Sequence, residues 1–221
     1  MKIQIERRSA VQQVADGLRA NMLSGSLPPG TRLRELELAE TLEVARSTVR
    51  EALIVLRNER MVSRRSEGRG WEVRRLSADE IDDIFKARIA LEKAAIDAAR
   101  NGGPESLTPL RRSVEELATT MKADDKLAIL EADFECHLAL VRVLDSQRLV
   151  DMYAELLLDL RLSLANLERP SDWPRELRNH RKFVRLLERG EFDEADEVLS
   201  TRLEYVRSSL SELLAPGERM A

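Results

Sequence analysis

The chain has 221 residues, of which 43% are hydrophobic and 34% charged, a composition typical of a globular protein with one large domain or two small ones. No apolar run approaches the ~20 residues that cross a bilayer, and the first residues lack the apolar segment of a secretory signal. We therefore expect neither a membrane span nor export. The single cysteine, Cys136, excludes a disulfide within the chain and fits the reducing cytoplasm, where we expect the protein to act.

The formal net charge of −4 conceals an asymmetry along the chain. Residues 1–76 contain 15 Lys and Arg against 10 Asp and Glu, whereas residues 77–221 contain 21 against 30. The basic excess is concentrated in residues 44–75. A basic unit followed by an acidic one suggests that the first part meets a polyanion, although charge alone fits a solvated surface equally well.

Helical spacing of apolar residues predicts three helices in the first unit. The first covers residues 9–25 and is ended by the Gly and Pro residues that follow it. The second covers residues 35–42 and the third about 46–58, with roughly four residues between them. Two short helices joined in this way are typical of a helix-turn-helix.

The start of the third helix has the residue types that read DNA. Arg46 and Arg50 lie one turn apart, and a guanidinium group can hydrogen-bond a guanine edge or clamp a phosphate. In a helix-turn-helix this end of the second helix enters the major groove. Thr48 and Glu51 fit a capping box, although Ser47 could equally begin the helix.

Two short strands, residues 61–65 and 70–76, are predicted after these helices. Gly68 and Gly70 permit a tight turn between the strands, which would form a wing, and Arg69 at its tip could reach a groove or the backbone. The order of helices, wing and basic residues favours DNA binding over a solvated surface. The candidate DNA contacts are Arg34, Arg46, Ser47, Thr48, Arg50, Arg69 and Gly70.

The segment LRANMLSGSLPPGTRLRELELAETLEVARSTVREALIVLRNERMVSRRSEGRGWEV resembles the winged helix of the GntR family of bacterial transcription regulators. The resemblance implies binding to double-stranded operator DNA, which is palindromic if the protein is a homodimer. Three positions depart from the family pattern. Ala45 replaces a Ser that could cap the helix or contact a phosphate, Thr48 replaces a frequent Pro, and Arg60 replaces the Gly before the wing.

The remainder of the chain, residues 77–221, is predicted to be an all-α bundle with no strand. Ser77 and Glu80 form a capping box at its start. Thr108 and Pro109 are a second possible helix start, with Pro at the first helical position. The expected helices cover residues 78–100, 106–121, 124–144, 147–168, 173–189 and 191–214.

Polar side chains fall on the apolar faces of four of these helices: Arg88, Glu92, Asp133, His137, His180 and Arg202. Arg202, for example, lies among Val198, Leu199, Tyr205 and Val206. Buried charges are costly unless they are paired or bind something, so these residues predict one shared polar cavity. Asp133 and His137 are one turn apart and could hold a metal with His180 as third ligand. A buried Asp–His pair or an Asp133–Arg202 salt bridge would explain the same pattern without metal.

Residues 78–214 resemble the FCD ligand-binding domain of the FadR-like branch, through KARIALEKAAIDAA, DFECH and NHRKFVRLLERGEFDEADEVLSTRL. In many members one Asp and three His bind a divalent metal, which helps to hold a small carboxylate effector. Asp133, His137 and His180 match three of these ligands, whereas Arg202 occupies the position of the fourth. The resemblance thus implies possible binding of one Zn²⁺ or Ni²⁺, or an arginine that takes over the role of the metal. The candidate effector contacts are Arg88, Glu92 and Arg202.

The sequence therefore predicts a mostly α protein, with a winged helix-turn-helix in residues 1–76 and an FCD-like bundle in residues 77–221. The favoured function is a transcription regulator, not an enzyme, whose operator binding responds to a small organic acid in the bundle. One alternative is a metal-dependent hydrolase centred on Asp133, His137 and His180, and another is an architectural DNA binder with a purely structural bundle. The hydrolase alternative leaves the winged helix unexplained. The architectural alternative leaves the inward polar residues unexplained.

Overall fold

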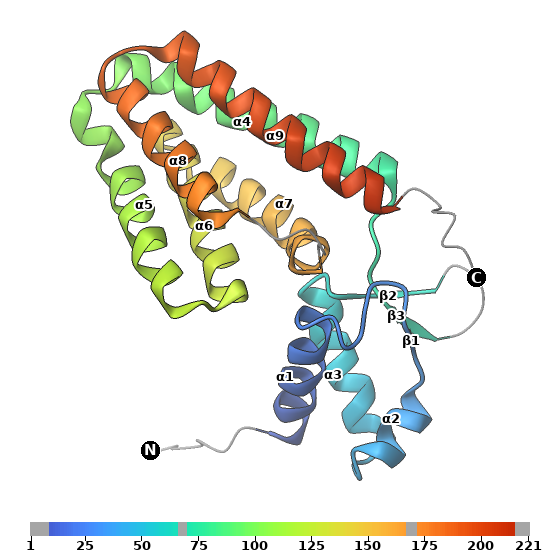
Figure 1. Cartoon of the computed structure of the whole chain (residues 1–221). Helices are drawn as coiled ribbons and strands as arrows, with labels where there is room; N and C mark the ends of the chain where they lie inside the picture. The colour runs from blue at the N-terminus through green and yellow to red at the C-terminus, as the bar shows by residue number, and fades with distance from the viewer. Residues whose placement is uncertain (1–8, 66–69, 167–171, 215–221) are drawn as a thin grey trace. The chain divides into compact units, whose positions relative to one another are not determined.

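The computed structural model describes residues 9–65, 70–166 and 172–214 (Figure 1). The chain divides into two compact units, residues 1–75 and 76–221. The predicted fold class is confirmed, because the first unit is a winged helix-turn-helix and the second a bundle of α-helices. Among the described residues, none of the helices is both long enough and apolar enough to cross a membrane.

The first unit packs its helices around α3. Its elements are α1 (Ala10–Leu23), β1 (Arg32–Leu33), α2 (Glu35–Thr41), α3 (Arg46–Asn58), β2 (Val62–Arg64) and β3 (Trp71–Val73). Both α1 and α2 contact α3, whose inner face is fully buried through Val49, Ala52, Leu53 and Leu56. Burial of this apolar stripe is what holds α3 in place and leaves its opposite face in solvent.

The wing contains one strand more than expected. The sheet order is β1-β3-β2 with antiparallel pairs, and Leu33 and Arg64 lie on either side of Trp71. The segment before β1 is held to β3 by two hydrogen bonds, from Gly30 N to Val73 O at 2.9 Å and from Val73 N to Thr31 O at 2.9 Å. A two-residue strand is too short to show alternation in the sequence, which is why β1 was not predicted.

The predicted capping box at Thr48 and Glu51 is wrong. The N-cap of α3 is Ala45, whose backbone is extended and whose methyl side chain makes no cap hydrogen bond. Ser47 and Thr48 therefore lie inside the first turn. The other predicted capping box, Ser77 with Glu80, is present at the start of α4.

The bundle has its helices at the predicted places. The described α-helices are α4 (Ala78–Asn101), α5 (Thr108–Thr120), α6 (Lys126–Val141), α7 (Gln147–Ala165), α8 (Trp173–Glu188) and α9 (Phe192–Leu214), with 3₁₀ turns η1 (Pro104–Leu107), η2 (Met121–Ala123) and η3 (Arg142–Leu144). Three predicted helices are thus shortened: one begins only at Thr108, and the other two end at Val141 and Ala165.

Long helices lie side by side in the bundle. Figure 1 shows α9 along α4, and α4 also contacts α6 and α7. The inner face of α4 therefore meets side chains from three other helices. Helix α8 contacts α5 and α9.

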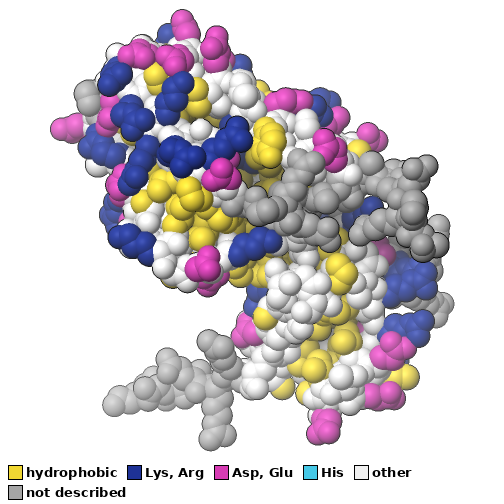
Figure 2. Space-filling view, in the orientation of Figure 1, with side chains coloured by type: hydrophobic (Ala, Val, Ile, Leu, Met, Phe, Trp, Pro, Cys, Tyr) yellow, Lys and Arg dark blue, Asp and Glu magenta, His cyan; other side chains and the backbone are white. Residues whose placement is uncertain are grey.

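Basic side chains cover one face of the bundle. Figure 2 shows Lys and Arg gathered over α5 and α8, with Asp and Glu nearby. On these helices Arg111, Arg181 and Lys182 each form an ion pair with a Glu. Exposed pairs of this kind contribute little to stability, so we regard this face as a solvated charged surface.

Candidate DNA-reading surface and polar pocket

The exposed start of α3 carries the two arginines predicted to read DNA. The side chains of Arg46 and Arg50 are 60% and 52% exposed. Both donate hydrogen bonds to the carboxylate of Glu35 on α2, from Arg46 Nε at 3.0 Å and from Arg50 Nη2 at 3.1 Å. Glu35 was not predicted to belong to this surface, because the sequence alone does not show that α2 faces the start of α3.

Glu35 also joins α2 to the wing. Trp71 of β3 donates from Nε1 to Glu35 at 3.2 Å, and the guanidinium carbon of Arg64 lies 3.8 Å from the centre of a Trp71 ring. The hydrogen bond from Arg50, with those from Trp71 and Arg46, outweighs burial and lowers the pKa of Glu35 to about 2. The charged carboxylate thus holds the two arginines and the wing together.

An open depression of about 650 Å³ lies at this junction. It is lined by Leu33, Arg34, Glu35, Leu36, Arg46, Arg50, Arg64 and Gly70. Four arginines and one glutamate therefore line the depression, an excess of positive charge that suits phosphate groups and the acceptor atoms of base edges. Arg64 was not predicted, although its place in a wing strand beside a basic run was a signal for it.

The other predicted DNA contacts have separate positions. Arg34 pairs with Glu37 at 2.6 Å on the exposed side of α2. Ser47 is exposed and Thr48 is half-buried in the first turn of α3. Gly70 has a φ of +139°, a backbone conformation that favours glycine. Arg69 lies outside the described residues.

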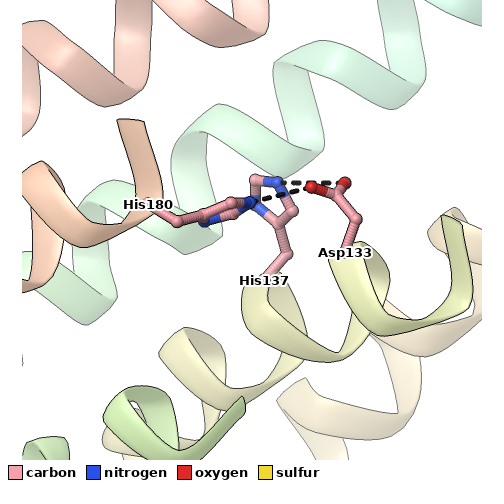
Figure 3. Close-up of side chains that lie close together, drawn as sticks. All are labelled: Asp133, His137 and His180. Atoms are coloured by element: carbon pink, nitrogen blue, oxygen red, sulfur yellow. Dashed lines mark hydrogen bonds and ion pairs between the residues drawn. The ribbon is translucent and has the colours of Figure 1, made fainter. Parts of the chain in front are cut away.

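The inward polar residues of the bundle meet in one cluster, as predicted. Figure 3 shows Asp133 and His137 from α6 facing His180 from α8. The distance from His180 Nε2 to Asp133 Oδ1 is 2.8 Å, and that from His137 Nε2 to Asp133 Oδ2 is 3.9 Å. All three residues are buried. Their ligand atoms lie within 4.8 Å of one another, close enough to share a metal ion by distance alone.

Arg202 of α9 enters the same cluster, and its side chain is only 12% exposed. It donates from Nη2 to Asp133 Oδ1 at 2.6 Å, from Nη1 to His137 Nε2 at 2.7 Å and from Nε to Glu176 Oε2 at 2.7 Å. The buried Asp–His contact and the Asp133–Arg202 salt bridge, which the sequence left as alternatives, are thus present together.

Glu92 of α4 also belongs to the cluster and is fully buried. His137 Nδ1 lies 2.7 Å from Glu92 Oε2, Arg88 Nη2 donates to Oε1 at 3.1 Å, and the hydroxyl of Tyr153 also donates to Oε1. Because His137 Nε2 accepts from Arg202, its proton must be on Nδ1, where it is donated to Glu92. His137 is therefore neutral in this arrangement.

Charges in the cluster are balanced by their neighbours. Burial would raise the pKa of Asp133, but the Arg202 guanidinium and the His180 hydrogen bond hold it well below its usual range. Burial likewise opposes ionisation of Glu92, yet the positive charge of Arg88 and the hydrogen bonds from His137 and Tyr153 lower its pKa to about 2. Burial and the positive charge of Arg202 lower the pKa of His180 to about 4, so His180 is neutral near pH 7.

Arg202 and its partners border a pocket of about 140 Å³. Its lining includes four basic residues, Arg88, Lys126, Arg175 and Arg202, and three acidic ones, Asp133, Asp172 and Glu176. Phe134, Trp173 and Tyr205 supply aromatic walls. Tyr205 was expected on the buried face of α9, but its side chain lines the pocket and is 56% exposed. The buried positions around it are instead Leu203, Ser209 and Leu210.

Two members of the cluster were not predicted. Glu176 precedes His180 by one helical turn, the same spacing as Asp133 and His137, and this repeat was a usable signal. Tyr153 lies in the apolar run of α7, and its sequence context does not distinguish a core tyrosine from a hydrogen-bonding one.

Comparison with known proteins identifies the families to which the two parts of the chain belong. Residues 10–73 match the model of the bacterial regulatory proteins of the gntR family, and residues 83–205 match that of the FCD domain. The chain belongs to the GntR family and carries an FCD domain, in agreement with the FadR-like branch. It is a DNA-binding transcription regulator.

Individual relatives extend over nearly the whole chain. The gluconate operon transcriptional repressor of Bacillus licheniformis is 26% identical over 226 residues, covering 98% of this chain and 91% of the relative. The regulator McbR of Escherichia coli K12 is 28% identical over 180 residues, covering 81% of this chain and 80% of McbR. These relatives are transcription regulators of a family that is not enzymatic, and they give no support to the hydrolase alternative.

Solved structures share the fold. A GntR transcriptional regulator from Rhodococcus sp. RHA1 has a TM-score of 0.68 at 25% identity, over 90% of this chain and 96% of the other. The Escherichia coli McbR/YncC structure has a TM-score of 0.64 at 22% identity, over 93% of this chain and 98% of the other.

Proposed function

We propose that the protein binds a palindromic operator as a homodimer and that a small carboxylate in the bundle pocket changes this binding. The observation that carries the proposal is the pocket itself, whose lining includes the buried Arg88 and the 12% exposed Arg202, with Lys126 and Arg175 as further positive charges. A guanidinium group recognises a carboxylate through two parallel hydrogen bonds. A regulator of this kind acts where its operator lies, in the cytoplasm.

DNA would be read by the start of α3 and the wing. Arg46→Ala and Arg50→Ala should each weaken specific operator binding by ~1–3 kcal/mol if the side chain reads a base. A fluorescence titration against an operator and a scrambled duplex, at fixed salt, measures this effect. Arg112→Ala is a matched control, because this arginine is 80% exposed but lies in the bundle. Unchanged binding in both α3 variants would place the DNA surface elsewhere.

The size of the pocket limits the effector. About 140 Å³ is close to the volume of a cavity that holds one benzene molecule. The pocket therefore suits an acid with few carbon atoms, with the aromatic walls against its carbon chain and the guanidinium groups at its carboxylate.

A thermal-shift panel of organic acids tests the effector. At a concentration of about 100 times Kd a ligand should stabilise the bundle by ~2.7 kcal/mol. The amide of each acid is the control, since it has the same shape without the negative charge. An acid that stabilises should also shift operator binding, and a flat panel would contradict a sensor of this kind.

Homodimerisation and repression are further parts of the proposal. A two-fold dimer matches a two-fold operator, with one α3 in each half-site. Native mass spectrometry of the intact chain reports its oligomeric mass, and a monomer bound to DNA would contradict the proposal. Repression is supported by relatives that are named operon repressors, and a reporter gene behind the operator tests its direction.

A further inference from the structure

We propose that the guanidinium group of Arg202 takes the place of the divalent metal in this FCD domain, so that the site is complete without a metal ion. The absence of a bound metal does not depend on the function proposed above. The binding of a carboxylate effector by Arg202 rests on that function.

Arg202 occupies the space that a metal would need. A metal bound by Asp133 and His137 would lie about 2.0–2.2 Å from each ligand atom. The nitrogens of Arg202 lie 2.6 Å from Asp133 Oδ1 and 2.7 Å from His137 Nε2. A metal at that position would overlap the guanidinium group.

The lone pairs required for metal binding are already used. His137 Nε2 accepts a hydrogen bond from Arg202, and its other nitrogen donates to Glu92. His180 Nε2 faces Asp133 Oδ1, a carboxylate oxygen, and must therefore carry the proton. In this tautomer neither imidazole nitrogen that faces Asp133 presents a free lone pair to a cation.

The charges also fit a built-in cation. Three carboxylates, from Glu92, Asp133 and Glu176, face two guanidinium groups, from Arg88 and Arg202. A dication added next to Arg202 would be repelled by it. If Arg202 were a neutral histidine, the three carboxylates and Arg88 would together carry a net charge of −2. One divalent metal ion would balance that charge.

Glu176 holds the arginine in its position. A long side chain must be anchored before its charge can act at a defined point, and Glu176 accepts a hydrogen bond from Arg202 Nε at 2.7 Å. The three hydrogen bonds use three of the five N–H groups of Arg202. The other two have no partner among the described residues and can bind a carboxylate in the pocket.

Metal analysis and calorimetry test the proposal. We expect the purified wild type to contain no stoichiometric zinc or nickel and to bind neither in titrations. Arg202→His should bind one equivalent, at least about 100-fold more tightly than the wild type. Arg207→His places a histidine on the same helix outside the cluster and should bind no better than the wild type. Arg202→Lys keeps the charge and should stay metal-free.

The outcomes separate this inference from the proposed function. One equivalent of tightly bound metal in the wild type overturns the inference, whether or not the Arg202 variants fold. Acid stabilisation that persists in EDTA supports it, and stabilisation that disappears in EDTA and returns with zinc or nickel overturns it. A metal-free wild type that binds no acid at all would contradict the effector proposal and leave the metal inference supported.

Discussion

Replacing Glu35 with Gln should destabilise the N-terminal unit by about 1–2 kcal/mol at neutral pH. In the folded chain, Arg50, Trp71 and Arg46 donate hydrogen bonds to the carboxylate and lower its pKa from 4.5 to about 2. This difference corresponds to about 3 kcal/mol in favour of the charged form. The two guanidinium groups are more than half exposed, so solvent screening reduces the stabilisation to the smaller figure.

The effect should depend on pH in one direction. Because the folded pKa of Glu35 lies below its ordinary value, the charged carboxylate stabilises the fold fully above about pH 5.5. The stabilisation is lost as the pH falls from about 4.5 towards 2. Wild type and Glu35→Gln should therefore differ most near neutral pH and converge on acidification.

Urea unfolding measures this difference. The chain has two tryptophans, so a Trp173→Phe background leaves Trp71 as a fluorescent reporter of the N-terminal unit. Glu37→Gln is a matched control, since Glu37 pairs with Arg34 in an exposed position on the same helix and should change stability by less than about 0.5 kcal/mol. Equal stability of Glu35→Gln and Glu37→Gln at pH 7 would refute the reasoning. So would a stability difference between wild type and Glu35→Gln that does not shrink from about pH 6 to pH 3.

Three further substitutions test other parts of the fold by urea unfolding. Arg60 has a φ of +57°, a backbone conformation that glycine adopts with less strain than alanine. Arg60→Gly should therefore be more stable than Arg60→Ala by about 1 kcal/mol. The opposite order would show that no backbone strain is relieved. Ser77→Ala removes the cap of α4 and should cost about 1 kcal/mol, whereas an unchanged midpoint would mean that the cap is replaced by water. Tyr153→Phe leaves Glu92 without one buried hydrogen-bond donor and should lower the free energy of unfolding by about 1–3 kcal/mol. Tyr205→Phe is the control, because Tyr205 is exposed and its hydroxyl should not matter for stability. Similar losses of stability in both variants would contradict the buried network.

Helix positions and faces could be predicted because apolar residues recur with the helical period. Val49 and Leu53 were correctly expected inside, and so were the polar residues Arg88 and His180. Capping patterns were less reliable. The pattern at Ser77 marks a real helix start, whereas the one at Thr48 lies inside a helix whose N-cap is Ala45.

Contacts between elements could not be predicted in the same way. The sequence indicated that Arg202 and Asp133 both point inward but left open whether they meet, and it gave no sign that Glu35 lies against Arg50. Such pairs depend on the distance and rotation between two helices. These are set by the packing of all their apolar side chains together.

The sequence by itself determined the winged helix-turn-helix, the helices of the bundle and most of the residues that face its interior. Each of these follows from local spacing, because the 3.6-residue period assigns every side chain to one face of its helix. Only the tertiary structure decided that Arg202 donates hydrogen bonds to Asp133, His137 and Glu176 together. That decision requires three helices to pack at defined distances, and a guanidinium group 2.6–2.7 Å from its partners results from this packing and not from any one segment.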